Sequence, residues 1–193
     1  LHIVIFILQY TRAAPGKRKD QNWAVLDIEA SALPPRSYLI EVAVAFPDTS
    51  AQAWLIQPTP VWLRDGVWSS GAETLHGLSE DILQTQGEPP RYVLDRVAEA
   101  VRDRRVLSDN LVSDSYWLGV LCAAAGIRPP PFHLTDFWQW SEPLGSPRDR
   151  ERALAEAYRH YPLRHRALPD AQRIACAIGL LARPSGRGSA SGT

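Results

Sequence analysis

The stretch that decides the fold is WAVLDIEASALPPRSYLIEVAVAF, residues 23–46. It begins with a short apolar run that ends on Asp27 and Glu29. After a proline-containing break, residues 37–46 are rich in β-branched and aromatic side chains, which predicts a second and longer strand. Side chains alternate between the two faces of a strand, so Asp27 and Glu29 are expected on one face and Ile28 on the other.

Two adjacent carboxylates on one strand face repel each other, so burying them for stability alone is unfavourable. A divalent cation between them would remove the repulsion, and hard cations such as Mg²⁺ prefer oxygen ligands. An acidic strand end that simply faces solvent is the alternative interpretation. Partners for Asp27 and Glu29 elsewhere in the chain decide between the two.

The composition is that of an ordinary globular protein. The 193 residues are 45% hydrophobic and 22% charged, which suits one domain with its own core. Twenty-one basic and 21 acidic residues give a formal net charge of zero, which argues against non-specific coating of nucleic acid but not against an enzyme that acts on a chain end. Cys122 and Cys176 lie in apolar, alanine-rich contexts, so we expect core residues and a cytoplasmic protein.

The two ends of the chain are predicted to lie outside the domain, which spans residues 21–182. Residues 1–20 form an N-terminal extension in which the apolar run 1–8 precedes basic residues. That run is too short to cross a bilayer, which takes about 20 apolar residues, and a signal peptide has its charges before the apolar run. We expect a disordered appendage and no membrane partner; a membrane-surface anchor is the alternative. The Gly/Ser tail 183–193 is also predicted to be disordered.

The rest of the chain predicts an α/β domain with a mixed five-stranded sheet flanked by helices. Residues 58–72 are predicted to be a loop, and His76 is expected in a second loop just before Ser79, a helix N-cap. Further short strands are expected at 51–57, 106–107 and 132–134. Helices are expected after Ser79 and at 92–102, about 114–126, 148–161 and 170–182.

The predicted loop 58–72 carries Trp62, Arg64 and Trp68. Aromatic side chains interleaved with arginine can stack on bases. They also commonly cover the edge of a small domain, and the sequence alone leaves both interpretations open.

Further carboxylates are expected at the sheet edge where Asp27 and Glu29 end their strand, since function in open α/β sheets gathers at carboxyl ends of strands. Asp114 follows the strand 106–107 and can reach that edge. Asp170 begins the last helix, and His165 in the preceding loop can orient a water next to a metal. Helix caps for the two aspartates and a surface position for the histidine are the separate alternatives. Together, and in this order, the residues favour a site where two cations about 4 Å apart promote phosphodiester hydrolysis.

Four segments that contain or adjoin these residues resemble the motifs of the DEDDh 3′–5′ exonucleases, the DnaQ-like branch of the ribonuclease H-like fold. The similarity spans about residues 23–182. Two departures, Ser113 in place of an aromatic residue and Asp109 in place of a frequent histidine, bear on substrate preference more than on catalysis. The matching segments are DIEASAL at 27–33, LHGLS at 75–79 (family His-Gly-Ile-Thr), NLVSD at 110–114 and HRALPDA at 165–171 (family His-x4-Asp).

The resemblance implies a ribonuclease H-like fold and a two-metal mechanism. Asp27, Glu29 and Asp170 would hold the first Mg²⁺ or Mn²⁺, and Asp27 also the second, with Asp114 contributing nearby. His165 would be the general base for the attacking water, a role that suits a side chain whose charge changes near neutral pH.

The resemblance also implies a pocket for one terminal nucleotide. Leu33 would pack against the terminal base, and His76 would help enclose the nucleotide. Arg164 and Arg166 flank the expected general base, His165, and either could contact backbone phosphate. The expected partners are 3′ ends of single-stranded RNA or DNA, and the choice between RNA and DNA stays open, as does the oligomeric state.

Two other functions remain possible on the sequence alone. One is a module of the same fold that binds nucleic-acid ends without turnover, although all five motif residues are present. The other is a nuclease of very short oligoribonucleotides.

Overall fold

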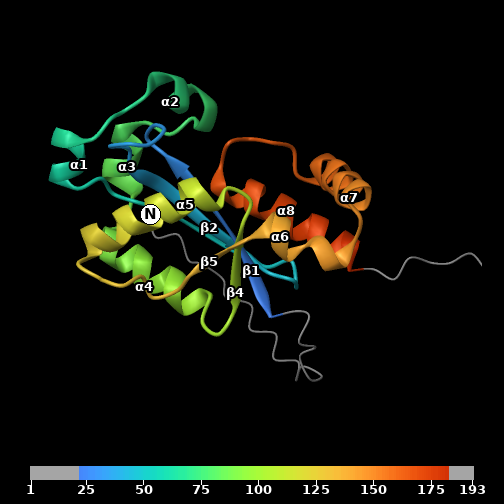
Figure 1. The fold of residues 1–193 in the computed structure, drawn as a ribbon. Helices are drawn as coiled ribbons and strands as arrows, with labels where there is room; N and C mark the ends of the chain where they lie inside the picture. The colour runs from blue at the N-terminus through green and yellow to red at the C-terminus, as the bar shows by residue number, and fades with distance from the viewer. Residues whose placement is uncertain (1–21, 183–193) are drawn as a thin grey trace, which may run out of the picture.

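The computed structural model describes residues 22–182, which form a five-stranded mixed sheet in the order β3-β2-β1-β4-β5 (Figure 1). The first three strands form an antiparallel meander, and β4 and β5 extend the sheet beyond β1, parallel to it. The predicted mixed sheet is confirmed. Its strands are β1 (Trp23–Ala30), β2 (Leu39–Ala45), β3 (Ala51–Leu55), β4 (Arg105–Ser108) and β5 (Leu134–Asp136). The predictions for residues 1–20 and 183–193 fall outside the described residues.

Helices cover both faces of this sheet. Helices α4 and α5 pack on one face, and α8 packs on the other with α7 beside it (Figure 1). The helices are α1 (Pro60–Asp65), α2 (Ser70–His76), α3 (Glu80–Gln86), α4 (Pro90–Ala100), α5 (Leu111–Ala125), α6 (Phe137–Trp140), α7 (Pro147–His160) and α8 (Ala167–Leu181), with a 3-10 helix at Glu142–Leu144.

The alternation of side chains along β1 separates two cores. Leu26 and Ile28 are buried among side chains of α4 and α5, whereas Trp23 and Val25 are buried against α8. Asp27 and Glu29 continue the row that faces α8. The prediction that the two carboxylates point away from Ile28 is therefore confirmed, and the helix they face is α8.

The prediction of a loop over residues 58–72 is wrong, because this segment contains α1 and the start of α2. Thr59 caps α1, its side chain accepting from the Trp62 amide at 3.1 Å, and Ser69 caps α2. Each helix has only six or seven residues, too few for apolar periodicity to emerge. The N-cap residues Thr59 and Ser69 were the sequence signal that could have indicated these helices.

The position predicted for His76 is also wrong. His76 is the last residue of α2 and is buried, and Gly77 ends the helix with a φ of 69°. Glycine is the residue that adopts this left-handed conformation without a steric cost, so the helix stops there. The next predicted feature is confirmed, since Ser79 caps α3 by accepting from the Ile82 amide.

The aromatic residues of this region cover the domain. The ring of Trp62 stacks on buried Tyr38, with centroids 5.3 Å apart, and the Trp68 indole donates to Glu73 at 2.7 Å. Both rings pack against the small core around Tyr38. Of the two interpretations of these tryptophans, the structure supports the covering role.

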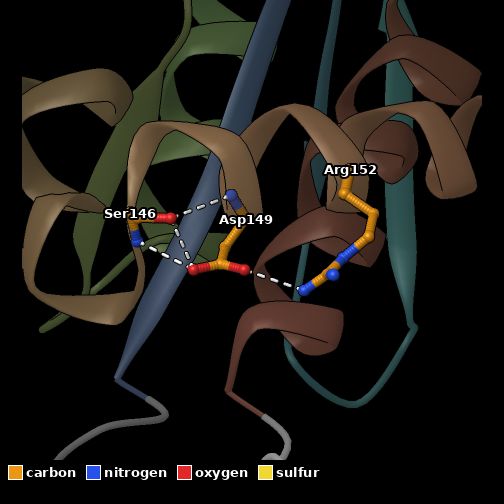
Figure 2. Close-up of polar contacts among 3 residues, drawn as sticks. All are labelled: Ser146, Asp149 and Arg152. Atoms are coloured by element: carbon orange, nitrogen blue, oxygen red, sulfur yellow. Dashed lines mark hydrogen bonds and ion pairs between the residues drawn. The ribbon is translucent and has the colours of Figure 1, made fainter.

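Most other predicted boundaries are within a few residues of the observed ones, but α6 and the 3-10 helix were not predicted. Helix α7 begins with a complete capping box, in which Ser146 and Asp149 bond reciprocally and Arg152 binds the second carboxylate oxygen of Asp149 (Figure 2). Cys122 is buried in the α4–α5 core, as predicted, whereas Cys176 of α8 is only partly buried beside α7. Within residues 22–182 there is no helix of the length and apolarity that a membrane span needs.

Candidate active site

Three carboxylates converge where the last residues of β1 meet the first turn of α8. One oxygen each from Asp27, Glu29 and Asp170 lie within 4.8 Å of one another. Asp27 and Glu29 come from adjacent positions on one face of β1, and Asp170 is brought over that face by the packing of α8. The predicted meeting of these three residues is confirmed.

The surroundings of this cluster disfavour negative charge. Burial raises the pKa of Asp27 well above its ordinary value, and neighbouring carboxylates add to the shift. Burial, followed by the charge of Asp170, raises the pKa of Glu29 to about 8. Arg173 supplies one compensating cation through its ion pair with Asp170. Such an arrangement costs free energy unless a cation or protons are bound.

Asp114 lies beside the cluster. It sits in the first turn of α5, is 3% exposed, and accepts a hydrogen bond from the Ser108 hydroxyl at 2.5 Å. Burial raises its pKa to about 7 despite that hydrogen bond. Its charge contributes to the raised pKa values of Asp27 and Glu29, but it is not one of the three mutually close residues. Asp114 therefore lies near the cluster, as predicted, but outside the group of three mutually close carboxylates.

Asp109 is a further carboxylate at this edge, and the sequence had marked it only as a departure from the family pattern. It directly follows β4, and Trp138 donates to its backbone carbonyl at 3.1 Å. Burial raises its pKa, and its charge is the largest of those that raise the pKa of Asp27. Its place directly after a predicted parallel strand, at the sheet edge where Asp27 and Glu29 were expected, was the signal available in the sequence.

His165 lies half-buried in the loop that leads into α8, as predicted. Its backbone has a φ of 49°, in the left-handed region that residues with a Cβ seldom adopt. A positive charge on His165 is among the smaller causes of the lowered pKa of His76.

Arg166 follows His165 and makes contacts that the sequence did not indicate. Its Nε and Nη2 donate to the two carboxylate oxygens of Glu41 at 2.9 and 2.7 Å. The Ala167 amide donates to the same carboxylate at 2.9 Å. Glu41 was missed because its partners lie about 125 positions away in the chain.

The residues predicted to enclose a nucleotide differ in exposure. Leu33 is 81% exposed just beyond β1. His76 is 4% exposed; its Nδ1 accepts from the Leu78 amide at 3.0 Å, and its Nε2 has no hydrogen-bond partner among the described residues. Burial lowers the pKa of His76, which favours the neutral ring with the proton on Nε2. Arg164 is exposed.

The donor set fits hard divalent cations. The three close side chains offer oxygen ligands alone, the type that Mg²⁺ and Mn²⁺ prefer over sulfur or imidazole. The raised pKa values of Asp27 and Glu29 indicate that the surroundings lack enough positive charge for carboxylates in this number. A bound cation would supply it.

Comparison with known proteins identifies the fold by structure and not by sequence. No protein-family model matches the chain, and no curated protein matches it. The nuclease domain of 3′hExo, a DEDDh family member bound to rAMP, matches with a TM-score of 0.62 at 18% identity, over 84% of this chain and 92% of that one. A 3′-exonuclease with 3′-end specific recognition of histone mRNA stem-loop matches with a TM-score of 0.59 at 17% identity, over 82% and 80%.

Escherichia coli exonuclease I in complex with a dT13 oligonucleotide is also similar, with a TM-score of 0.56 at 12% identity. The match covers 81% of this chain but 40% of exonuclease I, so the chain spans well under half of that protein. The chain thus has the ribonuclease H-like fold. More narrowly, it has the version of that fold found in DEDDh exonuclease structures. The activity has to be argued from the site.

Proposed function

We propose that this protein is a metal-dependent 3′–5′ exonuclease that shortens single-stranded RNA or DNA and releases nucleoside monophosphates. The convergence of Asp27, Glu29 and Asp170 within 4.8 Å carries the proposal. Carboxylates with raised pKa values at the carboxyl end of a parallel strand are typical of sites that bind and use cations. The fold shared with 3′-exonucleases supports the same reaction.

Asp27, Glu29 and Asp170 would hold one Mg²⁺ or Mn²⁺, and Asp27 a second with Asp114 nearby. When bound, the cations would favour deprotonation of a water and stabilise negative charge on the phosphodiester. Arg173, which is paired with Asp170, would have to share that carboxylate with a cation.

His165 would accept the proton of the attacking water. An imidazole can do this only in its neutral form, so the rate should fall at acid pH. It lies in the loop that leads into α8, the helix that carries Asp170. A terminal nucleotide would lie near His165 and His76.

Leu33 and His76 would form the pocket for that nucleotide. Exposed Leu33 offers an apolar surface to a base, and buried Nε2 of His76 offers a hydrogen-bond donor that has no acceptor among residues 22–182. A buried donor without a partner is costly, which is explained if the substrate supplies the acceptor. A pocket for one nucleotide predicts action at a free, unpaired 3′ end. We also propose a cytoplasmic location, on the cysteine contexts alone.

The test uses 5′-labelled oligonucleotides of one sequence, as RNA and as DNA, with a free 3′-hydroxyl, with a bulky 3′ block, or circularised. With Mn²⁺ or Mg²⁺, only the free 3′ end should shorten, one nucleotide at a time, and EDTA should stop the reaction. Cutting of the circle would indicate an endonuclease. Tight binding without shortening would indicate a binding module, and cleavage of only the shortest oligoribonucleotides would indicate the narrower nuclease.

A further inference from the structure

We infer that the ion pair between Glu41 and Arg166 is a positioning element that holds His165 in the conformation it needs as a base. The inference rests on the proposed function, and it concerns residues that neither bind the cations nor take the proton. It changes the role of Arg166 from a phosphate contact to a residue that acts through its neighbour.

Glu41 occupies a position where a glutamate is unfavourable for the sheet. It lies directly opposite Glu29 in the β1–β2 register and is 3% exposed. Like charges in directly opposed positions of neighbouring strands destabilise a sheet. The Glu41 charge adds to the raised pKa of Glu29, and Arg166 offsets part of that shift. The position therefore calls for a reason other than sheet stability.

The contacts of Glu41 supply that reason. Within the described residues, the three hydrogen bonds to its carboxylate come from two consecutive residues, Arg166 and Ala167. Helix α8 has no side-chain cap of its own at Arg166, and the Ala167 amide is one of the first-turn donors that lack a partner within a helix. Glu41 thus fixes the start of α8 from a neighbouring strand, and the paired Arg166 guanidinium gives the contact a defined direction.

This anchor lies immediately after His165. The left-handed backbone of His165 persists only when its surroundings hold it, because the conformation is disfavoured for residues other than glycine. On the other side, residues 162–164 are exposed and give the histidine little support. Restraint therefore comes from the anchored residues, Arg166 and Ala167. The Glu41 side chain is 4% exposed and that of Arg166 is 39%, so the pair is fixed mainly at its acidic end.

The test compares Arg166→Ala and Glu41→Gln with a matched control, Arg91→Ala. Arg91 also forms an ion pair, with Asp95, but on the exposed surface of α4. Glu41→Gln keeps the acceptor for Ala167 and leaves no buried unpaired charge, so it remains informative if Arg166→Ala folds poorly. In both test variants kcat should fall about 10- to 100-fold with KM changed little, as for a misplaced catalytic group. The control should match the wild type.

Coupling to His165 separates positioning from substrate contact. In a His165→Ala background, adding Arg166→Ala should reduce kcat no further, because the residue through which it acts is gone. A raised KM, or a loss that adds to that of His165→Ala, would overturn the inference in favour of a phosphate contact.

A second readout needs no activity. In NMR spectra of the histidine rings, Arg166→Ala and Glu41→Gln should shift the His165 signals toward those of an unrestrained imidazole, while the signals of exposed His133 and His160 stay in place. Unchanged His165 signals would overturn the inference even if the protein proves not to be a nuclease. Absence of wild-type cleavage with shifted His165 signals would instead contradict the proposed function alone.

Discussion

Two aspartates occupy the first turn of a helix in similar sequence positions and in opposite surroundings. The side chain of Asp149 of α7 is 43% exposed and completes a capping box with Ser146, and these hydrogen bonds lower its pKa (Figure 2). Asp114 of α5 is buried, and burial raises its pKa to about 7. The first residue stabilises its helix as a carboxylate, whereas the second is kept where its charge costs free energy.

The difference separates a first-turn aspartate that caps its helix from those that we propose to be functional. From the sequence alone, Asp114 and Asp170 could each have been a helix cap. A cap is exposed and is stabilised in its charged form. Asp170 is instead 4% exposed and shares a cluster with two strand carboxylates.

The largest effect is expected from removing a cluster ligand. Asp27→Asn should reduce the exonuclease rate by about 10³-fold or more, since metal-assisted stabilisation is worth several kcal/mol and 1.36 kcal/mol is tenfold. The protein should remain folded, because the substitution removes a repelling charge. Initial rates on a 5′-labelled oligonucleotide measure this. Asp149→Asn, the matched change at α7, should leave the rate unaltered; comparable losses in both variants would contradict the distinction.

A smaller but still large loss is expected at His165. General-base catalysis contributes about 10²- to 10⁴-fold, so His165→Ala should lose rate in that range. The acid limb of the pH–rate profile should also flatten. His160, exposed in the last turn of α7 and 3.6 Å from Glu156, is the control, and His160→Ala should keep the wild-type profile. If His165→Ala retains the acid limb at saturating Mn²⁺, a group other than His165 is responsible for it.

The buried carboxylates and the capping aspartate Asp149 should also affect stability with opposite pH dependence. The pKa values of Glu29 and Asp114 rise on folding, to about 8 and about 7, so between pH 6.5 and 8 the folded state binds more protons than the unfolded chain. In EDTA the free energy of unfolding should therefore fall across that window, by on the order of 1–3 kcal/mol. The lowered pKa of His76 opposes this fall only at the acid end of the window, close to the ordinary pKa of 6.5.

Urea unfolding at pH 6.5 and pH 8 measures this dependence, and Mn²⁺ should restore the stability lost at pH 8. The contribution of Asp149 has the other sign. Its pKa is lowered on folding, so its contribution is present above its ordinary pKa and is lost only as the pH falls through the lowered value. A metal-free protein that gains stability between pH 6.5 and 8 would contradict the assignment of buried, uncompensated carboxylates.

The smallest effect belongs to the capping box. Ser146→Ala should lower stability by about 0.5–2 kcal/mol, the usual cost of removing an N-cap side chain. The exonuclease rate should stay at the wild-type value, since α7 carries none of the proposed site residues. A thermal melt and a rate measurement on the same preparation decide this. A fall in rate at a temperature where the variant is fully folded would show that α7 contributes to the site.

The sequence made the sheet and the acidic cluster predictable for physical reasons. Residues 23–46 contain two long β-rich runs, and the alternation along β1 placed Asp27 and Glu29 on one face. The His-x4-Asp spacing then placed Asp170 at the start of the last helix. Each of these patterns spans only a few consecutive residues, so it can be recognised in the sequence without knowledge of the fold.

The features that escaped prediction depend on short elements or distant partners. Helices α1 and α2 are shorter than two full turns, and this is why His76 was expected in a loop rather than at a buried helix end. Glu41 lies in an apolar strand, and no role could be inferred for it before the structure placed Arg166 beside it. The electrostatic influence of Asp109 on Asp27 likewise depends on the parallel pairing of β4 with β1.

The central claim is that Asp27, Glu29 and Asp170 come together to hold a divalent cation. Anomalous diffraction from crystals grown with Mn²⁺ at neutral pH tests it directly. The account predicts a strong anomalous peak bound by one oxygen from each of the three side chains, at about 2 Å, the distance typical of Mg²⁺ sites. Crystals that show no peak there at saturating Mn²⁺, with Asp170 still paired only to Arg173, would contradict it.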